Sequence, residues 1–247
     1  ILFTRIENAG VKRIDYIVSN HAEQDHSGSL PDALDRFPGA KVLATAKGRS
    51  MLLDLLPLDA ERIETVEVGQ TLDLGGRTLE FIHAPWVHWP ETMFTYLRED
   101  GILFSFDLFG SHLATNDLYV MDKGRFLDSA KRYYAEVMMP FSGPVRRNMD
   151  KIGGLKINLI APSHGPLHRE PDFILDVYRD WSGEEPKNLV VIPYVSMHGS
   201  TRKMTAHFIE SLVSRGVRVE FFNLAETDMG RLSMALVDAA TVVFGSP

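Results

Sequence analysis

The apolar pattern of the chain changes near residue 185, and this change constrains the fold more than any other feature. Beyond it, strand patterns cover 189–195, 217–223 and 241–245, while helical spacing covers 201–215 and 228–240. This βαβαβ order is typical of a parallel, doubly wound sheet. A stretch of about 60 residues buries too little apolar surface to be secure alone. We therefore expect more chain to follow in the native protein.

The stretch before residue 185 mixes hairpins with helices. Strand patterns cover 14–19, 62–68 and 157–161, hairpins are predicted over 71–84 and 93–107 with turns at Gly75-Gly76 and Glu99-Asp100-Gly101, and helical spacing covers 50–56, 128–139 and 172–181. This mixture predicts an α/β sandwich of sheets with helices outside. With the polar run 182–188 as the linker, we predict one domain over 1–184 and a second over 188–247.

Composition excludes several classes of protein. The chain has 26 Lys and Arg against 33 Asp and Glu, a net charge of −7. A nucleic-acid-binding surface needs a clustered basic stripe, so no nucleic acid is expected as a partner. No apolar run approaches the roughly 20 residues of a membrane span, so no membrane is expected either. Cysteine is absent, which excludes disulfides, iron–sulfur clusters, rubredoxin-type iron and a cysteine nucleophile within this stretch.

Four potential metal ligands fall within six residues directly after the strand 14–19. They are His21, Glu23, Asp25 and His26. In an extended segment alternate side chains project the same way, so His21, Glu23 and Asp25 are expected to converge, with His26 turned in from the other side. A single such residue in a loop is usually solvated, but a cluster this dense favours a metal site.

Further candidates fall at strand ends, where an α/β scaffold gathers a site from separate segments. They are His83, His88, Asp107 and His164. His83 is equally compatible with packing, and the remaining histidines lack a comparable context. Histidines with a bridging carboxylate suit two adjacent metal ions. Glu23, in place of a second imidazole, shifts the preference towards iron or manganese without excluding zinc.

The whole set resembles the flavodiiron proteins, in which a metallo-β-lactamase-like αββα domain is fused to a flavodoxin-like domain. The resemblance rests on His-x-Glu-x-Asp-His at 21–26, His88-Trp89-Pro90, Asp107 and the Ser-His-Gly-Pro turn at 163–166. The intervals of 62 (88 − 26) and 19 (107 − 88) residues are close to the family pattern. Hydrolytic members of the superfamily usually carry a second His where this chain has Glu23.

The resemblance implies a di-iron centre. His21, Glu23 and His88 would bind one iron, Asp25, His26 and His164 the other, and Asp107 would bridge the two. The aromatic and apolar side chains of Trp86, Trp89, Met93 and Phe109 are candidates for a hydrophobic wall beside the metals, although such residues are more often plain core.

A hydroxyl-rich loop follows the strand 189–195 and precedes a helix. It contains Ser196, Met197, His198, Gly199, Ser200 and Thr201. Amides and the dipole at a helix N-terminus favour an anion, though a simple N-cap is the plainer interpretation. The loop is similar to the FMN phosphate loop of flavodoxins, and Gly245, Ser246 and Pro247 resemble the start of the second flavin loop. FMN is thus the second implied cofactor.

The resemblance implies an FMN-fed di-iron oxidoreductase that reduces dioxygen to water, nitric oxide to nitrous oxide, or both. It also implies a cytoplasmic setting and a head-to-tail homodimer or dimer of dimers. The electron donor would be a rubredoxin, a flavin reductase or a reduced deazaflavin. Two alternatives stay open: a di-zinc hydrolase of the metallo-β-lactamase type, and a non-catalytic electron carrier or binding module with a structural metal.

The two ends of the sequence carry one more expectation. The chain begins at Ile1 and ends at Pro247, directly after an apolar strand. The resemblance implies that Ile1 falls after the opening strands of the metal domain and that Pro247 falls inside a flavin loop. We expect the native chain to be longer at both ends and heavier than 27.8 kDa.

Overall fold

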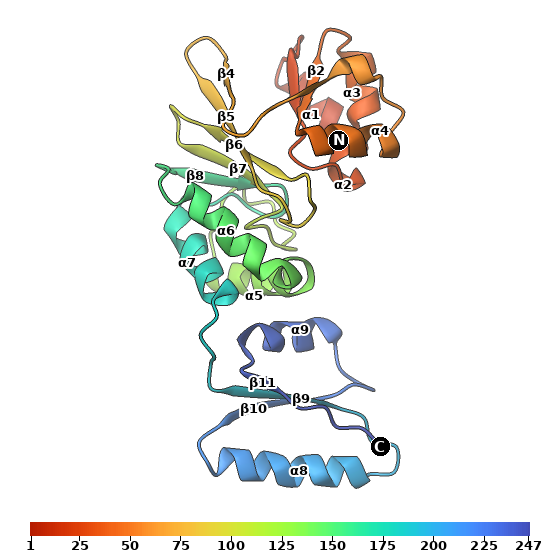
Figure 1. Cartoon of the computed structure of the whole chain (residues 1–247), viewed down its shortest axis with the longest axis vertical. Helices are drawn as coiled ribbons and strands as arrows, with labels where there is room; N and C mark the ends of the chain where they lie inside the picture. The colour runs from red at the N-terminus through yellow and green to blue at the C-terminus, as the bar shows by residue number, and fades with distance from the viewer. The chain divides into compact units, whose positions relative to one another are not determined.

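The apolar run near the start of the chain forms the first strand of a parallel sheet in the computed structural model, which describes all residues 1–247 (Figure 1). The sheet has the order β1-β2-β3 and consists of β1 (Tyr16–Val18), β2 (Lys41–Ala44) and β3 (Ile63–Thr65). Its helices are α1 (Leu2–Asn8), α2 (Gln24–Ser27), α3 (Leu30–Arg36), α4 (Ala46–Leu55) and the short η1 (Ala60–Arg62). The predicted strands 14–19 and 62–68 are confirmed in shorter form.

The helix predicted over 50–56 begins earlier, because Thr45 acts as its N-cap. The Thr45 side chain accepts a hydrogen bond from the backbone N–H of Gly48, which satisfies one of the first-turn donors. The core beneath this sheet gathers Leu34, Val42, Leu52 and Ile63, all buried. The sequence patterns did not predict α1, α2, α3 or β2.

A second sheet, of five strands, contains both predicted hairpins. Its order is β4-β5-β6-β7-β8, with β4 (Thr71–Asp73), β5 (Thr78–His83), β6 (Met93–Leu97), β7 (Ile102–Phe106) and β8 (Leu159–Pro162). The first four strands are antiparallel, whereas β8 runs parallel to β7. Leu43 of the first sheet and Val66, which directly follows β3, pack with Phe81 and Met93 from the second sheet. The predicted sandwich of sheets is therefore confirmed.

The chain divides into two units, the first formed by Ile1–Leu108 with Asp150–Ser163 and the second by Phe109–Met149 with His164–Pro247. Both sheets described above belong to the first unit. The predicted boundary near residue 185 lies inside the second unit, so the division into 1–184 and 188–247 stays a prediction.

The second unit begins with helices around an aromatic core. They are α5 (Lys123–Tyr133), the π-helical η2 (Tyr134–Met138), η3 (Met139–Phe141), α6 (Ser142–Ile152), whose last three residues belong to the first unit, and α7 (Pro171–Ser182). Tyr178 stacks edge-on against Phe109 and Tyr134 at ring distances of 4.8 and 5.2 Å. The helices predicted over 128–139 and 172–181 are confirmed, with α5 starting earlier behind its N-cap Asp122.

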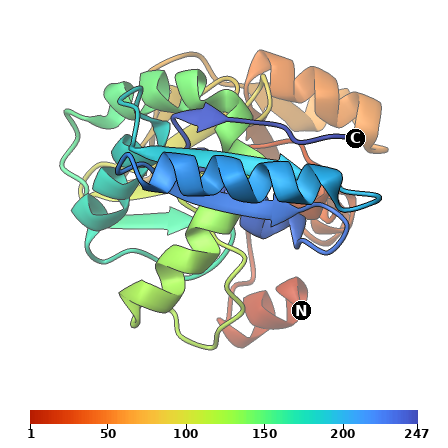
Figure 2. The same cartoon turned by 90° about the horizontal axis from the view of Figure 1, so that it is seen from below.

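The end of the chain forms the predicted half of a doubly wound sheet. All three strands are parallel, in the order β10-β9-β11, from β9 (Leu189–Tyr194), β10 (Arg218–Asn223) and β11 (Thr241–Val242). Figures 1 and 2 show α8 (Ser200–Val213) and α9 (Met229–Asp238) on opposite faces of this sheet. In chain order the strands lie 2-1-3, which is the order of flavodoxin-like sheets. None of the helices combines the length and apolar character needed to cross a membrane.

Candidate metal centre and phosphate loop

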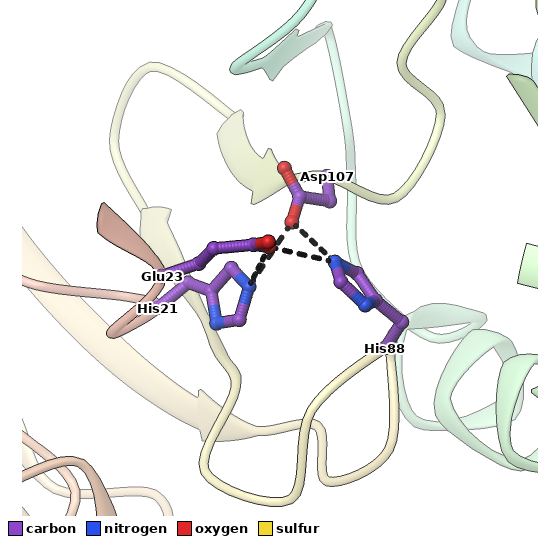
Figure 3. A group of neighbouring side chains, drawn as sticks. All are labelled: His21, Glu23, His88 and Asp107. Atoms are coloured by element: carbon purple, nitrogen blue, oxygen red, sulfur yellow. Dashed lines mark hydrogen bonds and ion pairs between the residues drawn. The ribbon is translucent and has the colours of Figure 1, made fainter. Parts of the chain in front are cut away.

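Four of the predicted ligands come together in the first unit. His21 and Glu23 follow β1, His88 lies in the loop between β5 and β6, and Asp107 follows β7. Figure 3 shows their side chains pointing toward one another, and one ligand atom from each lies within 4.8 Å of the others. The Nε2 atom of His21 is 3.2 Å from Glu23 and 3.4 Å from Asp107, and that of His88 is 3.3 Å from each.

The backbone just before Asp107 is bent sharply. The register between β7 and β8 shifts between Leu103 and Phe106, and Phe106 has a φ of 58°. The left-handed region costs a non-glycine residue about 1–2 kcal/mol. This bend ends the strand and carries Asp107, 1% exposed, into the ligand group. The Phe106 ring also packs against the His26 ring, at a centroid distance of 4.6 Å.

Asp107 presents its two oxygens to different histidines. Oδ2 faces His21 and His88, while Oδ1 lies 3.0 Å from Nε2 of His26. This is the arrangement that a carboxylate shared between two cations needs.

Asp25 does not extend the row of His21 and Glu23 as predicted. The chain turns into the helix α2 at Gln24, so the alternation of an extended strand ends at Glu23. Asp25 instead lies beside His26, with Oδ2 at 3.3 Å from Nε2 and its side chain half exposed.

His164 belongs to the second unit and follows β8. Its carbonyl accepts a hydrogen bond from the Ser111 N–H, and its ring centroid lies 6.0 Å from that of Tyr133. Its role as a ligand stays a prediction. His83 bonds through Nε2 to the Val66 carbonyl, in accord with the packing interpretation.

The residues considered for a hydrophobic wall have different surroundings. Trp89 stacks edge-on against His21 at 5.0 Å, whereas Trp86 is half exposed. Met93 belongs to the core between the two sheets, and Phe109 packs against Tyr178 in the second unit. Phe106, which was not predicted for this role, contacts the rings of His21 and His26.

Sequence reasoning missed Glu91, which holds His21 from behind. Its Oε1 lies 2.7 Å from Nδ1 of His21 and accepts the Ala22 N–H at 2.9 Å. Burial raises the pKa of Glu91, but these hydrogen bonds outweigh it and the net pKa is lowered. Burial likewise lowers the pKa of His21, but Glu91 and Asp107 outweigh it and the net pKa is raised. The only sequence signal was a carboxylate three positions after His88.

The donor set fits a metal ion. With Nδ1 of His21 donating to Glu91, the neutral ring carries a lone pair on Nε2. That lone pair faces the carboxylate oxygens of Glu23 and Asp107, so acceptors meet acceptors unless a cation lies among them. Imidazole nitrogens with carboxylate oxygens suit iron, manganese and zinc.

The predicted phosphate loop joins β9 to α8. The hydroxyl of Ser196 accepts from the N–H groups of Gly199 and Arg202, and Gly199 has a φ of 83°. Gly245 lies next to this loop, because a Cβ atom there would meet the Thr201 side chain at 3.4 Å. The start of the predicted second loop therefore adjoins the first, at the N-terminus of a helix that favours anions.

Comparison with known proteins shows what this chain is similar to. Residues 2–165 match the family described as "ODP family beta lactamase". The chain is 38% identical over 257 residues to the coenzyme F420H(2) oxidase of Methanothermobacter marburgensis, covering 100% of this chain and 64% of that protein. It is 37% identical over 244 residues to the nitric oxide reductase of Moorella thermoacetica, covering 95% and 60%.

A solved structure agrees. The flavodiiron protein from Giardia intestinalis superposes with a TM-score of 0.90 at 31% identity, covering 98% of this chain and 61% of that one. The chain thus spans about 60% of the length of the relatives it matches.

Proposed function

Because the chain belongs to the ODP family of β-lactamase-like domains, we propose that it forms the larger part of a flavodiiron oxidoreductase. The reaction would be reduction of dioxygen to water, of nitric oxide to nitrous oxide, or both. The observation that carries the proposal is the group His21, Glu23, His88 and Asp107, in which a glutamate stands beside two histidines. The names of the relatives, an oxidase and a nitric oxide reductase, support it.

The proposed ligand set follows the family resemblance. His21, Glu23 and His88 would hold one iron, Asp25, His26 and His164 the second, and Asp107 would bridge them. The placement of the two Asp107 oxygens toward different histidines supports the bridge. Domains over 1–184 and 188–247 belong to the same proposal.

Ser196, Met197, His198, Gly199, Ser200 and Thr201, with Ser246 and Pro247, would bind FMN through its phosphate. Reduction of dioxygen to water consumes four electrons and four protons, and the irons and FMN together would supply the electrons. The protein's own part is to hold the ligands and to limit water beside them. Trp89 and Phe106, packed on the histidine rings, support that role.

The proposed partners follow from the relatives. A reduced deazaflavin, a rubredoxin or a flavin reductase would deliver electrons, and the name of the F420H(2) oxidase favours the first. A head-to-tail homodimer or a dimer of dimers, in the cytoplasm, completes the proposal. The di-zinc hydrolase is not favoured, since the relatives are named as an oxidase and a reductase and Glu23 makes the ligand set more anionic.

Metal and flavin analysis of the purified full-length protein tests this function. Two irons and one FMN per chain, together with oxygen or nitric oxide consumption, are expected. Two zinc ions and no flavin would refute it.

A further inference from the structure

Glu91 lies deep in the loop between β5 and β6 and is 3% exposed. Its Oε1 accepts two hydrogen bonds from consecutive residues, one from Nδ1–H of His21 and one from the Ala22 N–H. One carboxylate oxygen therefore ties both the ring and the backbone of the loop after β1. Because His88 is on the loop that carries Glu91, this contact also joins two loops that bear candidate ligands.

The contact with Glu91 decides which nitrogen of His21 faces the site. An oxygen acceptor at 2.7 Å keeps the proton on Nδ1, so that the lone pair of the neutral ring lies on Nε2. Nε2 is the atom that faces Glu23 and Asp107. In the other tautomer, Nε2–H would point at these carboxylates and a metal would be displaced.

Glu91 is itself held from the opposite side. The Thr45 hydroxyl donates to the Glu91 carbonyl at 3.0 Å and accepts from the Gly48 N–H at 2.9 Å. At Gly48 a Cβ atom would lie 3.5 Å from Cγ of Glu91 and 3.2 Å from the Thr45 hydroxyl. The first turn of α4 thus fixes the loop that carries the carboxylate.

The charge on Glu91 needs an explanation beyond anchoring. Its second oxygen, Oε2, is buried without a hydrogen-bond partner. An unpaired buried carboxylate oxygen is costly, and a neutral Gln would accept the same two hydrogen bonds at Oε1. A negative charge behind the ring is favourable when the ring's far nitrogen binds a cation, because it strengthens the imidazole as a donor.

We propose that Glu91 is a positioning residue of the metal centre, which fixes the His21 tautomer and strengthens its Nε2 as a ligand. This inference rests on the proposed function, in that His21 must bind a metal. Residues in this position behind a ligand typically account for about 10- to 100-fold in metal affinity.

The test compares Glu91→Ala and Glu91→Gln with the control Glu64→Gln, an exposed glutamate on β3. Binding of Co²⁺ to the metal-free, full-length protein is titrated by its visible ligand-field spectrum. We expect affinity for the first Co²⁺ to fall about 10- to 100-fold in the Ala variant and several-fold in the Gln variant. The control should bind as the wild type does.

Long-range ¹H–¹⁵N spectra of the metal-free proteins, recorded at a pH at which the His21 ring is neutral, give an independent readout. The Nδ1–H tautomer of His21 is expected in the wild type and in Glu91→Gln, and a tautomer mixture in Glu91→Ala. Should the Ala variant fail to fold, as thermal unfolding will show, the nearly isosteric Gln variant decides. Wild-type Co²⁺ affinity in Glu91→Gln and in a folded Ala variant would overturn the role of Glu91.

The failure of the proposed function would look different. A wild-type protein that holds the Nδ1–H tautomer but binds no Co²⁺ contradicts both the metal site and the role of Glu91 in it. Normal Co²⁺ binding with unchanged variants contradicts the role of Glu91 alone.

Discussion

Asp107 is the residue on which the candidate centre depends most, because its two oxygens face different histidines. Asp107→Asn keeps the size of the side chain but removes its charge. It also places an amide N–H₂ toward either His21 and His88 or His26. Residues that only hydrogen-bond to metal ligands account for about 10- to 100-fold in metal affinity. Loss of a ligand that bridges two ions should therefore lower the affinity for metal by about 100-fold or more. Iron per chain after dialysis is the measurement.

The exposed Asp54→Asn on α4 is the matched control for this change, and it should retain the iron of the wild type. Asp107→Asn with undiminished iron would show that the carboxylate does not bridge.

His168 makes a prediction about pH. It is 1% exposed and its Nε2–H donates to the Phe109 carbonyl at 3.0 Å. Burial lowers its pKa to about 4, and the hydrogen bond offsets this only in part. The unfolded chain takes up a proton near pH 6.5 and the folded chain near pH 4. Between these values the unfolded state binds more protons, so stability falls as the pH falls, by about 3 kcal/mol at most.

Urea unfolding at pH 7.5 and pH 4.5 measures this difference. His168→Gln removes the titrating group and should flatten the dependence, whereas the exposed His207→Gln should leave it unchanged. An equal slope in wild type and His168→Gln would contradict the prediction.

At the level of single residues, the ligand types were readable from the sequence because carboxylates and imidazoles crowd into 21–26 and recur at strand ends. The residues that each of these side chains contacts could not be predicted from the sequence. Alternation placed Asp25 in the row of His21, because nothing in the sequence showed that a helical turn begins at Gln24, whereas the family resemblance placed it with His26, beside which it lies. Glu91 was missed because its partner lies 70 positions away, and hydrogen bonds across that separation leave no local pattern.

Among the elements, the β6–β7 hairpin depends on the glycine in its turn. Gly101 has a φ of 67°, and a Cβ atom there would lie 2.6 Å from the Asn158 side chain and 2.7 Å from the Lys156 carbonyl. Gly101→Ala should lower the free energy of unfolding by about 3 kcal/mol. Gly39→Ala, where a Cβ atom meets nothing, should change it by less than about 1 kcal/mol. Chemical denaturation distinguishes the two, and equal losses would count against the clash.

The last residue of α9, Asp238, connects this helix to two lysines outside it. Asp238 accepts hydrogen bonds from Lys131 of α5 and from Lys187, and its side chain is 24% exposed. Burial raises its pKa, but the two ammonium groups outweigh this and the net pKa is lowered. The stabilisation is therefore present at neutral pH and is lost as the pH falls below the ordinary range of an aspartate.

Asp238→Asn should cost about 1–2 kcal/mol at neutral pH. Asp176→Asn, which breaks an exposed pair with Arg179 on α7, should cost about 0.5 kcal/mol or less. The free energies of unfolding at low and high salt provide the measurement. If Asp238→Asn lowers the free energy of unfolding no more than the control does, the contacts of Asp238 with Lys131 and Lys187 do not stabilise the fold.

Elements with strong periodicity were predicted, namely both hairpins, the later helices and the βαβαβ run. The short ones were not. In α2 and α3 the helix is four and seven residues long, too short for an apolar stripe to show its period. β2 begins at a lysine and is defined by the parallel neighbours on both sides rather than by its own pattern.

For the whole molecule, the metal should act as a stabilising ligand. A cation that binds the folded chain alone stabilises it by about 2.7 kcal/mol at 100-fold excess over Kd, equivalent to roughly 5–10 °C in Tm for a chain of this size. Scanning calorimetry with Fe²⁺ or Co²⁺, followed by a chelator, measures the shift and its reversal. Mg²⁺, which prefers oxygen ligands and water, is the control. An unchanged Tm with Co²⁺ would contradict a metal centre in this chain.

The global architecture was predictable since each half follows one rule: alternating patterns make hairpins, and continuous apolar runs separated by helices make a parallel sheet. The grouping into two units was not, because it depends on which surfaces pack after the elements exist.

The span between the ligands bears on how the protein acquires its metal. His21 and Asp107 are 86 positions apart (107 − 21), and their meeting requires both sheets to be assembled. In a zinc finger the ligands are close in sequence and the ion can template folding. Here residues 21–26 are close in sequence, but the complete group also needs His88 and Asp107, which reach it only after long loops have closed. On the proposed function, we therefore expect the complete metal site to form only after folding, and a metal-starved cell to accumulate a folded apoprotein rather than a degraded chain.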